Sequence, residues 1–284
     1  MVEKKNKKAN VTAVYALYYS ATGNTAKVVK AVTEKIAQEL GLPAKYMTYT
    51  SPASREKDYE FGEGDLVIVG TPVYAGRVPN KMLPFLQTRL HGKGALALPV
   101  VTFGNRAYDN SLRELGRELI GRGFCVVGGA AVVAQHAFAN KLGVNRPTEE
   151  DLCGLRAFAK QVADKLETEE RELLQSKEVP GEEEVGAYYT PLGIDGKPTV
   201  FLKAKPKTHM DKCTVCNVCV KCCPMGAITL NKPDEVPGVC IKCQACVKKC
   251  PTGAKYFDDP AFLSHLAMLE EHYIQAKENA FFLS

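Results

Sequence analysis

The chain contains 284 residues with a formal net charge of +5, 11 cysteines and no tryptophan. This length is enough for about two domains, each with its own core, and no apolar run approaches the ~18 residues that a membrane-spanning helix requires. Residues 1–10 are polar and rich in lysine. Because they lack the apolar stretch of a secretory signal peptide, we expect a disordered leader there.

Residues 11–168 alternate between buried strands and amphipathic helices. The first apolar run, 11–19, is rich in β-branched and aromatic residues, as in a parallel strand that is buried on both faces. Further strands are expected at 44–49, 65–70, 98–103 and 124–134. Pro99 is expected at the start of its strand, since proline cannot donate to a ladder. Thr148 and Asp151 form a capping-box pattern before the last helix. This order predicts an α/β domain with a doubly wound, five-stranded parallel sheet.

Three polar or glycine-containing loops follow the first, third and fourth of these strands. In open parallel sheets, cofactors bind beyond the carboxyl ends of the strands at the topological switch point. The first loop places three hydroxyl groups and Gly23 at a helix N-terminus, where free N–H groups and the helix dipole attract a phosphate. A helix simply capped by serine or threonine would share this pattern, but the position after the first strand favours the phosphate site.

The first loop resembles the phosphate loop of flavodoxins, and the other two match the loops that flank the isoalloxazine ring of FMN in that family. The resemblance covers residues 11–168 and implies FMN as a cofactor. The residues that it implies for FMN binding are Ser20, Ala21, Thr22, Gly23, Asn24 and Thr25 in the first loop, Thr71, Pro72, Val73, Tyr74, Ala75 and Gly76 in the second, and Phe103, Gly104, Asn105, Tyr108 and Asp109 in the third. Tyr74 and Tyr108 could stack on the flavin, although a loop tyrosine can also serve packing alone.

A linker is expected at 169–207, where a charge-rich stretch is followed by turn signals. Its aromatic residues Tyr188, Tyr189 and Phe201 could pack between two domains. His136, after the fifth strand, would lie near the flavin end of the sheet, where packing is a simpler role than chemistry.

Eight cysteines in the segment 208–257 repeat one spacing twice. The first copy is Cys213, Cys216, Cys219 and Cys223, and the second is Cys240, Cys243, Cys246 and Cys250, each followed by proline. This C-x2-C-x2-C-x3-C-P spacing is typical of cysteines that ligate iron–sulfur clusters. Zinc sites use four ligands in CxxC pairs and would leave thiolates over. A disulfide framework needs an oxidising compartment, which nothing in the sequence indicates.

The segment 208–257 resembles two-cluster bacterial ferredoxins, in which the fourth cysteine of each copy serves the other cluster. We therefore expect two 4Fe–4S clusters, one on Cys213, Cys216, Cys219 and Cys250 and the other on Cys240, Cys243, Cys246 and Cys223. Cys222 fits neither set and is expected to be a bystander. Clusters and a bound phosphate would carry negative charge, so the positive net charge does not predict nucleic-acid binding.

The segment 258–284 is expected to hold a docking helix that begins at Asp259-Pro260. Its apolar side chains would face a domain, at Phe262, Leu263, Leu266 and Leu269. On this reading His265 and His272 are exposed polar positions.

The whole chain resembles flavodoxin–ferredoxin fusion proteins of anaerobic bacteria and archaea. The resemblance implies a cytoplasmic electron-transfer protein in which FMN connects two-electron with one-electron chemistry. The alternative is an FMN-dependent reductase of a small acceptor, fed by its own clusters, although no catalytic constellation is recognisable. Lysines around the cysteine motifs favour redox partner proteins with an acidic docking surface. The sequence leaves open the oligomeric state, a homodimer included, and the order of the redox potentials.

Overall fold

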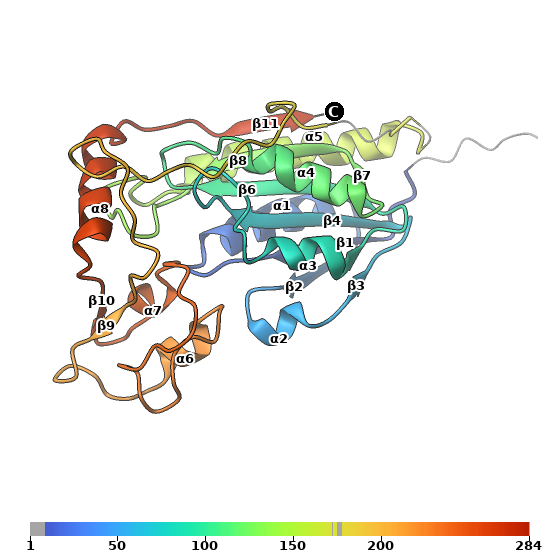
Figure 1. Cartoon of the computed structure of the whole chain (residues 1–284). Helices are drawn as coiled ribbons and strands as arrows, with labels where there is room; N and C mark the ends of the chain where they lie inside the picture. The colour runs from blue at the N-terminus through green and yellow to red at the C-terminus, as the bar shows by residue number, and fades with distance from the viewer. Residues whose placement is uncertain (1–8, 172, 175–177, 284) are drawn as a thin grey trace, which may run out of the picture.

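The structure, a computed structural model, describes residues 9–171, 173–174 and 178–283 (Figure 1). Five parallel strands form its centre, in the spatial order β2, β1, β4, β6, β8. Their bounds are β1 Ala13–Tyr18, β2 Ala44–Thr48, β4 Asp65–Pro72, β6 Leu96–Phe103 and β8 Gly128–Val133. This is the strand order of flavodoxin-like doubly wound sheets. The predicted α/β fold is therefore confirmed. Outside this sheet, β3 (Tyr59–Glu60) pairs with β5 (Leu90–His91).

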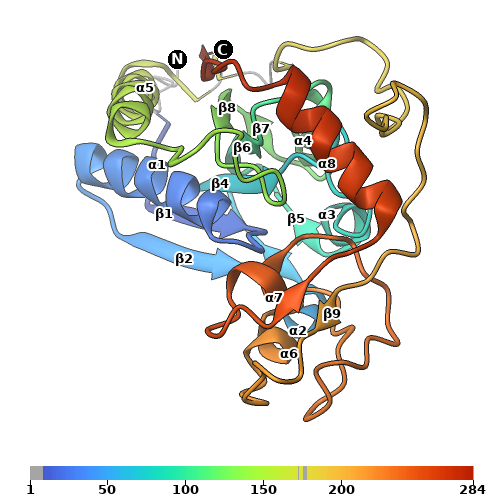
Figure 2. The same ribbon diagram turned by 90° about the vertical axis from the view of Figure 1, so that its left-hand side faces the viewer.

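Helices cover both faces of the sheet (Figure 2). Their bounds are α1 Asn24–Leu40, α3 Leu83–Thr88, α4 Ser111–Gly121 and α5 Glu149–Thr168. Side chains of β4 divide between two cores: Leu66 and Ile68 pack with α1 and α5, whereas Val67 and Val69 pack with α3 and α4. A strand buried on both faces has a continuous apolar sequence, which is why the strands could be predicted. The capping box of Thr148 and Asp151 is present at α5.

The position of Pro99 differs from the prediction, because it is the fourth residue of β6 and not the first. Val127 donates its N–H to the carbonyl oxygen of Ala97 at 3.0 Å, and in a parallel ladder its own carbonyl faces the nitrogen of residue 99. Proline carries no hydrogen there. The neighbouring strand is accordingly interrupted at Val127, between β7 (Cys125–Val126) and β8. On its other edge, β6 continues to pair with β4, where Val69 lies opposite Pro99.

A small cysteine-rich lobe, residues 205–257, packs against the larger domain beside α2 (Pro52–Arg55) (Figures 1 and 2). Its regular elements are short: β9 Lys207–Thr208, α6 Val218–Cys222, α7 Ala245–Lys248 and β10 Lys255–Tyr256. The strands β9 and β10 pair with each other in antiparallel fashion. Two polar contacts join the lobe to the larger domain: Arg55 donates to the carbonyl oxygen of Pro224, and Lys248 donates to the side-chain oxygen of Asn140.

Helix α8 (Pro260–His272) docks as predicted, but on a different face. The buried residues are Phe262, His265, Met268 and Leu269. Leu263 is 42% exposed, so its expected role in docking was wrong, and so was the exposed position expected for His265. His272 is exposed as expected. Aromatic residues from distant segments determine which face of α8 is buried. Phe138 and Phe201 pack on Phe262 with ring centroids 4.9 and 5.6 Å away.

After His272 the chain returns to the main sheet, which the prediction of a terminal docking helix missed. Strand β11 (Ala280–Leu283) pairs antiparallel with β8 and becomes an edge strand. Asn279 accepts the N–H of Val133 at 2.8 Å, and Phe281 stacks on Phe158 with ring centroids 5.1 Å apart. The carboxyl-terminal segment thereby fastens α8 to the larger domain.

The predicted leader and linker are described only in part. Residues 1–8 lie outside the described residues, and Ala9 is buried against the α1 and α5 core. The described residues between 169 and 206 form no helix, and Leu192 pairs with Pro198 in an isolated bridge. No helix in the described part of the chain is long and apolar enough to cross a membrane.

Candidate functional site

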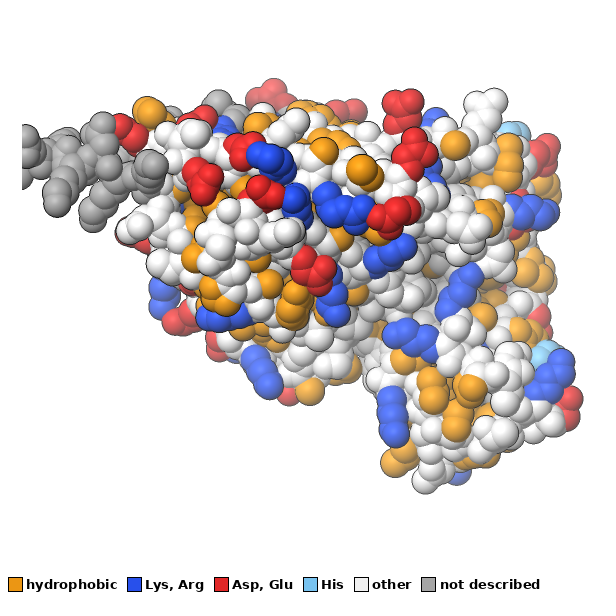
Figure 3. Space-filling model, turned by 180° about the vertical axis from the view of Figure 1, so that it is seen from behind, with side chains coloured by type: hydrophobic (Ala, Val, Ile, Leu, Met, Phe, Trp, Pro, Cys, Tyr) orange, Lys and Arg blue, Asp and Glu red, His pale blue; other side chains and the backbone are white. Residues whose placement is uncertain are grey.

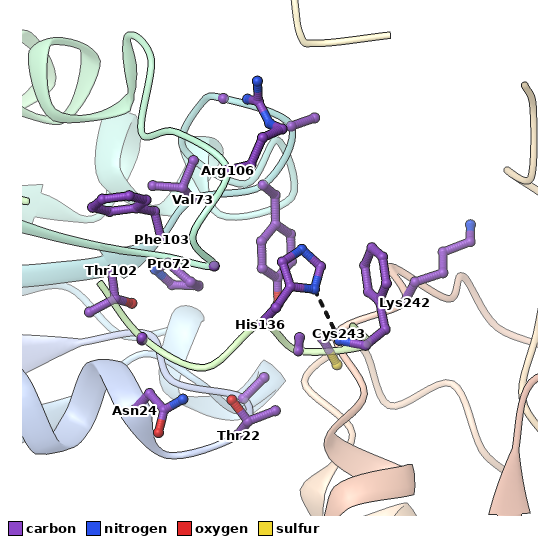
Figure 4. A pocket seen from close by; sticks show the side chains of 18 of the residues that line it. Thr22, Asn24, Pro72, Val73, Thr102, Phe103, Arg106, His136, Lys242 and Cys243 are labelled. Carbon is purple, nitrogen blue, oxygen red and sulfur yellow. Dashed lines mark hydrogen bonds between the residues drawn. The ribbon is translucent and has the colours of Figure 1, made fainter. Parts of the chain in front are cut away.

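A cavity of about 240 Å³ lies beyond the carboxyl ends of β4, β6 and β8 (Figure 4). Its walls come from four parts of the chain: the loops of the larger domain, the linker, helix α8 and the cysteine-rich lobe. All three loops predicted for cofactor binding contribute to it. The residues from these loops are Ala21, Thr22, Asn24, Thr25, Pro72, Val73, Tyr74, Ala75, Gly76, Phe103 and Gly104.

The first loop leaves the N-terminus of α1 open towards the cavity. Gly23 precedes the helix with φ 110°, a left-handed conformation, and as the N-cap residue it makes no side-chain capping bond. The Ser20 hydroxyl accepts the N–H of Ala26 at 3.1 Å, and the Thr25 hydroxyl lies 2.7 Å from that of Thr102. Two of the three predicted hydroxyls are therefore already partnered. The Thr22 hydroxyl has no hydrogen bond within the described residues, so it is free to donate to an anion.

The second loop forms an aromatic wall of the cavity. The Tyr74 hydroxyl lies 3.3 Å from the hydroxyl of Tyr19, and burial raises the pKa of Tyr74 well above its usual value. Gly76 has φ 79°, and a Cβ there would lie 2.3 Å from a carboxylate oxygen of Asp109. Only glycine therefore fits this turn, which brings the second and third loops together.

The third loop contributes less than predicted. Asn105 is buried, and its amide donates to the carbonyl oxygens of Tyr273 and Gln275, the latter at 2.9 Å. It therefore holds the segment after α8 and does not line the cavity. Tyr108 packs on Phe103 with ring centroids 5.4 Å apart and lines a separate surface hollow together with Asp109. The structure thus gives no support to flavin stacking by Tyr108. Ser20, Gly23 and Thr71 do not line the cavity: Ser20 and Thr71 are buried, and Gly23 is exposed to solvent.

His136 lies in the cavity wall, on the loop after β8 (Figure 4). Its Nδ1 accepts the backbone N–H groups of Phe138 and Ala139 at 3.3 and 3.1 Å, so the neutral ring carries its hydrogen on Nε2. Burial, reinforced by His265 and nearby cations, lowers the pKa of His136 to about 3. Gly104 makes room for the ring, because a Cβ there would lie 2.2 Å from its Cδ2 atom.

The cysteine-rich lobe closes one side of the same cavity. Ile241, Lys242 and Cys243 line it opposite the loops of the larger domain (Figure 4). Ile241 and Cys243 also pack against the core under α3 and α4. Cys243, a residue of the second cysteine motif, therefore lies in the wall of the same cavity that the loop at 20–25 lines. Nothing in the local sequence indicates this contact.

Two small cavities inside the lobe are each lined by four cysteines. The first is lined by Cys213, Cys216, Cys219 and Cys250, and the second by Cys223, Cys240, Cys243 and Cys246. Each set combines three cysteines of one copy with the fourth of the other. Among the described residues, no three His, Cys, Asp or Glu side chains converge as they would on a single metal ion. Thiolates at the corners of a cube-shaped cluster would lie farther apart.

The backbone of both copies turns N–H groups towards the sulfur atoms. Val215 and Lys242 have φ 53° and 55°, and they donate to Cys213 and Cys240 at 3.4 and 3.5 Å. Ala227 and Ala254 donate in the same way to Cys223 and Cys250, both at 3.3 Å. A left-handed valine is uncommon, so this geometry is imposed by the surrounding structure. Such bonds stabilise negative charge on sulfur.

Cys222 lines neither small cavity. It packs against the core of the larger domain, and burial raises the pKa of its thiol to about 11. Its role in the structure is to fill space between the two parts of the chain, which agrees with its place outside the repeated spacing.

Comparisons with known proteins identify the larger domain. Residues 15–144 match a family described as Flavodoxin domain. The amino-terminal part of this chain has a flavodoxin-like fold and matches that family over residues 15–144. Similar solved structures include a flavodoxin from the domain Archaea, with 14% identity and a TM-score of 0.42 over 55% of this chain and 99% of that chain. The flavodoxin of Streptococcus pneumonia TIGR4 has 24% identity and a TM-score of 0.38 over 54% of this chain and 99% of that chain. The rubredoxin oxygen:oxidoreductase of Desulfovibrio gigas has 22% identity and a TM-score of 0.36 over 57% of this chain and 37% of that chain. No curated protein matches the chain.

Several cavity residues come from outside the flavodoxin-like domain or from parts of it that sequence reasoning did not assign. They are Tyr189, Pro191 and Phe201 of the linker, His265 of α8, the loop 134–138, Arg106, and the lobe residues Ile241, Lys242 and Cys243. The sequence offered two signals: it placed His136 near the flavin end of the sheet, and it identified the linker aromatics as packing residues between domains.

Proposed function

We propose that this protein is a cytoplasmic electron-transfer protein that holds FMN in the large cavity and two 4Fe–4S clusters in the cysteine-rich lobe. When bound, FMN exchanges one or two electrons and each cluster exchanges one. The protein would thus connect two-electron with one-electron donors and acceptors, as the resemblance to fusion proteins of anaerobes implies.

The residues of the large cavity fit FMN. The N-terminus of α1, where the Ser20 hydroxyl accepts only the Ala26 N–H, and the free Thr22 hydroxyl offer donors to a phosphate. Apolar and aromatic side chains supply flat walls for a ring, among them Val73, Tyr74 and Phe103. Cavities of this type are mostly apolar with a few placed polar groups. The flavodoxin-like fold makes FMN the expected ligand.

The two cysteine sets fit cube-shaped clusters. Each set surrounds one small cavity, and backbone N–H groups point at the sulfur atoms of Cys213, Cys223, Cys240 and Cys250. Burial raises the pKa of the Cys243 thiol to about 12, so without a metal this residue would stay protonated. Iron would replace that proton and hold the sulfur as a thiolate.

The observation that carries this proposal is the shared wall at Cys243. This residue belongs to the second cysteine set and lines the large cavity at the same time. A flavin in the cavity and a cluster on this set would be separated by little more than one side chain. The first set lies farther out in the lobe, where Cys216 is exposed. We infer the order flavin, second cluster, first cluster, with external one-electron partners at the first cluster.

The experiment is anaerobic reconstitution followed by analysis and rapid reduction. We expect one FMN and about eight iron atoms per chain. Cluster bleaching should precede flavin reduction when a one-electron donor is mixed with the oxidised protein. If one FMN binds per chain but is reduced before either cluster, the proposed order of electron transfer is contradicted. Absence of iron from the reconstituted lobe would contradict the proposal itself.

The second candidate function, an FMN-dependent reductase of a small acceptor, is favoured by one observation. The cavity wall contains aromatic and histidine side chains from the linker and α8, which a flavodoxin-like domain does not supply.

A further inference from the structure

The two copies of the cysteine motif differ in charge at one buried position. The first copy continues C-P-M-G-A-I from Cys223 to Ile228, and the second continues C-P-T-G-A-K from Cys250 to Lys255. The backbone is alike in both, because the alanine before this position donates its N–H to the cysteine sulfur at 3.3 Å in each copy. Ile228 is 6% exposed and Lys255 is 3% exposed. Equivalent interior positions therefore hold an apolar side chain in one copy and an ammonium group in the other.

Lys255 has no carboxylate to balance its charge. It is the only buried lysine among the described residues. Its ammonium group donates to the carbonyl oxygen of Pro233, which also accepts the Thr208 hydroxyl at 3.0 Å. None of the ion pairs in the described part of the chain includes Lys255. A buried charge is costly unless a charge of opposite sign lies nearby, so the negative partner must come from a group that the lobe binds.

The cysteine sets lie within reach of this charge. Lys255 lines the small cavity of the first set, whereas its equivalent Ile228 lines that of the second. Ile228 packs in one small core with Cys219 of the first set and Cys246 of the second. Burial raises the pKa of both thiols, and the positive charge of Lys255 opposes this rise in each. The charge therefore acts on both sets, and its place in the wall of the first cavity makes the first set its main partner.

We propose that the Lys255 ammonium group raises the reduction potential of the first cluster and, to a lesser extent, that of the second. Reduction adds one electron to a cluster whose thiolate ligands already make it negative. A cation held in the interior stabilises that electron more than an exposed lysine does, because water and salt screen it less. The electron comes from a one-electron donor, and no bond forms or breaks at Lys255. This inference rests on the proposed function, since it requires the clusters.

The test is a redox titration of the reconstituted protein, followed by electron paramagnetic resonance of the reduced clusters. Lys255→Met removes the charge and keeps the length of the side chain. Lys255→Ile places there the residue that the first copy already buries at the equivalent position. In both variants the ratio of reduced to oxidised first cluster at a fixed potential should fall about tenfold or more. For a one-electron couple, a tenfold change lowers the midpoint by about 59 mV.

The matched control is Lys207→Met, which removes the same charge from the strand that pairs with that of Lys255. The Lys207 side chain is 62% exposed and pairs with Asp258, so its charge is screened and neither midpoint should change measurably. Combining Lys255→Met with Cys223→Ser, which we expect to keep only the first cluster, assigns the shift to that cluster. Iron content should be the same in Lys255→Met, Lys255→Ile, Lys207→Met and the wild type.

Four results would overturn the inference. Both midpoints could stay unchanged in the two Lys255 variants, or Lys207→Met could lower them equally, which would show an effect of net charge alone. The second cluster could shift more than the first. Loss of iron from both Lys255 variants would assign the side chain to cluster assembly instead of the potential, and if only one variant keeps its iron, that variant decides. Failure of the proposed function would appear separately, as a wild-type protein that binds no iron.

Discussion

At the scale of single residues, the two copies of the cysteine motif assign different roles to neighbouring thiols. Cys222 and Cys223 are adjacent, yet Cys223 lines the second small cavity and Cys222 packs against the flavodoxin-like domain. The N–H of Ala227 points at the sulfur of Cys223, whereas the Cys222 thiol donates weakly to the Cys219 carbonyl oxygen at 3.6 Å. The structure therefore places one thiol at the cavity of the second cysteine set and its neighbour against the flavodoxin-like domain.

This difference can be measured as iron content. Cys223→Ser should lose about four of about eight iron atoms per chain, because it removes one corner of the second cluster. Cys222→Ser should keep all of them, with at most a small loss of stability. Iron analysis and visible spectra of the two purified variants provide the measurement. Equal iron loss in both variants would show that the cysteine register is shifted.

A second residue-scale prediction concerns the Thr22 hydroxyl. It is the one predicted phosphate donor that has no partner among the described residues, since Ser20 and Thr25 are engaged. A hydrogen bond to a charged group is worth about 1.5–3 kcal/mol, so Thr22→Ala should lower the affinity for FMN about ten- to a hundredfold. Affinity for riboflavin, which lacks the phosphate, should not change. Fluorescence titration of the apo-protein measures both constants.

The control is Thr12→Ala, which removes a hydroxyl that donates to the Gly64 carbonyl oxygen at the opposite end of the sheet. The Thr12→Ala variant should bind FMN and riboflavin with unchanged affinity. If riboflavin affinity fell in parallel with FMN in Thr22→Ala, the loop would contact the ring or the ribityl chain and not the phosphate.

At the scale of secondary-structure elements, the loop after β4 is held in place by helix α4. Glu114 is buried and accepts the N–H of Val78 at 2.9 Å and the guanidinium of Arg77, with Arg77 Nε at 3.2 Å. Arg77 also donates to the Gly186 carbonyl oxygen at 2.9 Å and lies over the Tyr188 ring at 4.5 Å. One ion pair thus connects the cavity loop, α4 and the linker.

Removing this pair should destabilise the protein. Glu114→Ala would leave the Val78 N–H and the Arg77 guanidinium without their acceptor, and breaking a buried pair costs about 3–5 kcal/mol. Urea unfolding, followed by circular dichroism, measures the loss in free energy of unfolding. Asp58→Ala is the matched control, because Asp58 pairs with Arg89 at the surface. The side chains of Asp58 and Arg89 are 51% and 45% exposed. Asp58→Ala should cost less than about 1 kcal/mol, and a similar loss in both variants would contradict the role given to Glu114.

The sequence predicts those elements that follow a local pattern. Strand β4 is a continuous apolar run, the α5 cap is a four-residue motif, and the cysteine spacing repeats within 38 residues of chain between Cys213 and Cys250. The elements that it missed depend on contacts between distant segments. The buried face of α8 is set by Phe138 and Phe201, and β11 forms only because the edge of β8 is free to pair.

At the scale of the whole molecule, the cysteine-rich lobe closes one side of the large cavity. Seen from behind, the lobe carries exposed hydrophobic side chains with lysines around them (Figure 3). Lys248 is not free for a partner, because its ammonium group donates to Asn140 of the flavodoxin-like domain. Lys212 and Lys249 are exposed and adjoin Cys213 and Cys250 of the first cysteine set. They are the lysines best placed to meet a partner at the outer cluster.

We expect an acidic partner surface at this end, and electron transfer that slows as salt rises. Exposed charges act over a Debye length of about 10 Å at 0.1 M salt, and transient redox contacts are small enough to depend on such steering. Replacing Lys212 and Lys249 together with Gln should lower the association rate with an acidic redox protein about two- to fivefold at low salt. The salt dependence should become flatter, and iron content should not change.

The matched control replaces Lys93 and Lys160 with Gln. It removes the same charge from the flavodoxin-like domain, where both side chains pair with carboxylates and lie away from the lobe. Stopped-flow reduction at several ionic strengths compares the two double variants with the wild type. Because both lose the same net charge, a difference between them can come only from where the charges sit. Equal effects of the two double variants, or rates that do not respond to salt, would place the docking surface away from the first cysteine set.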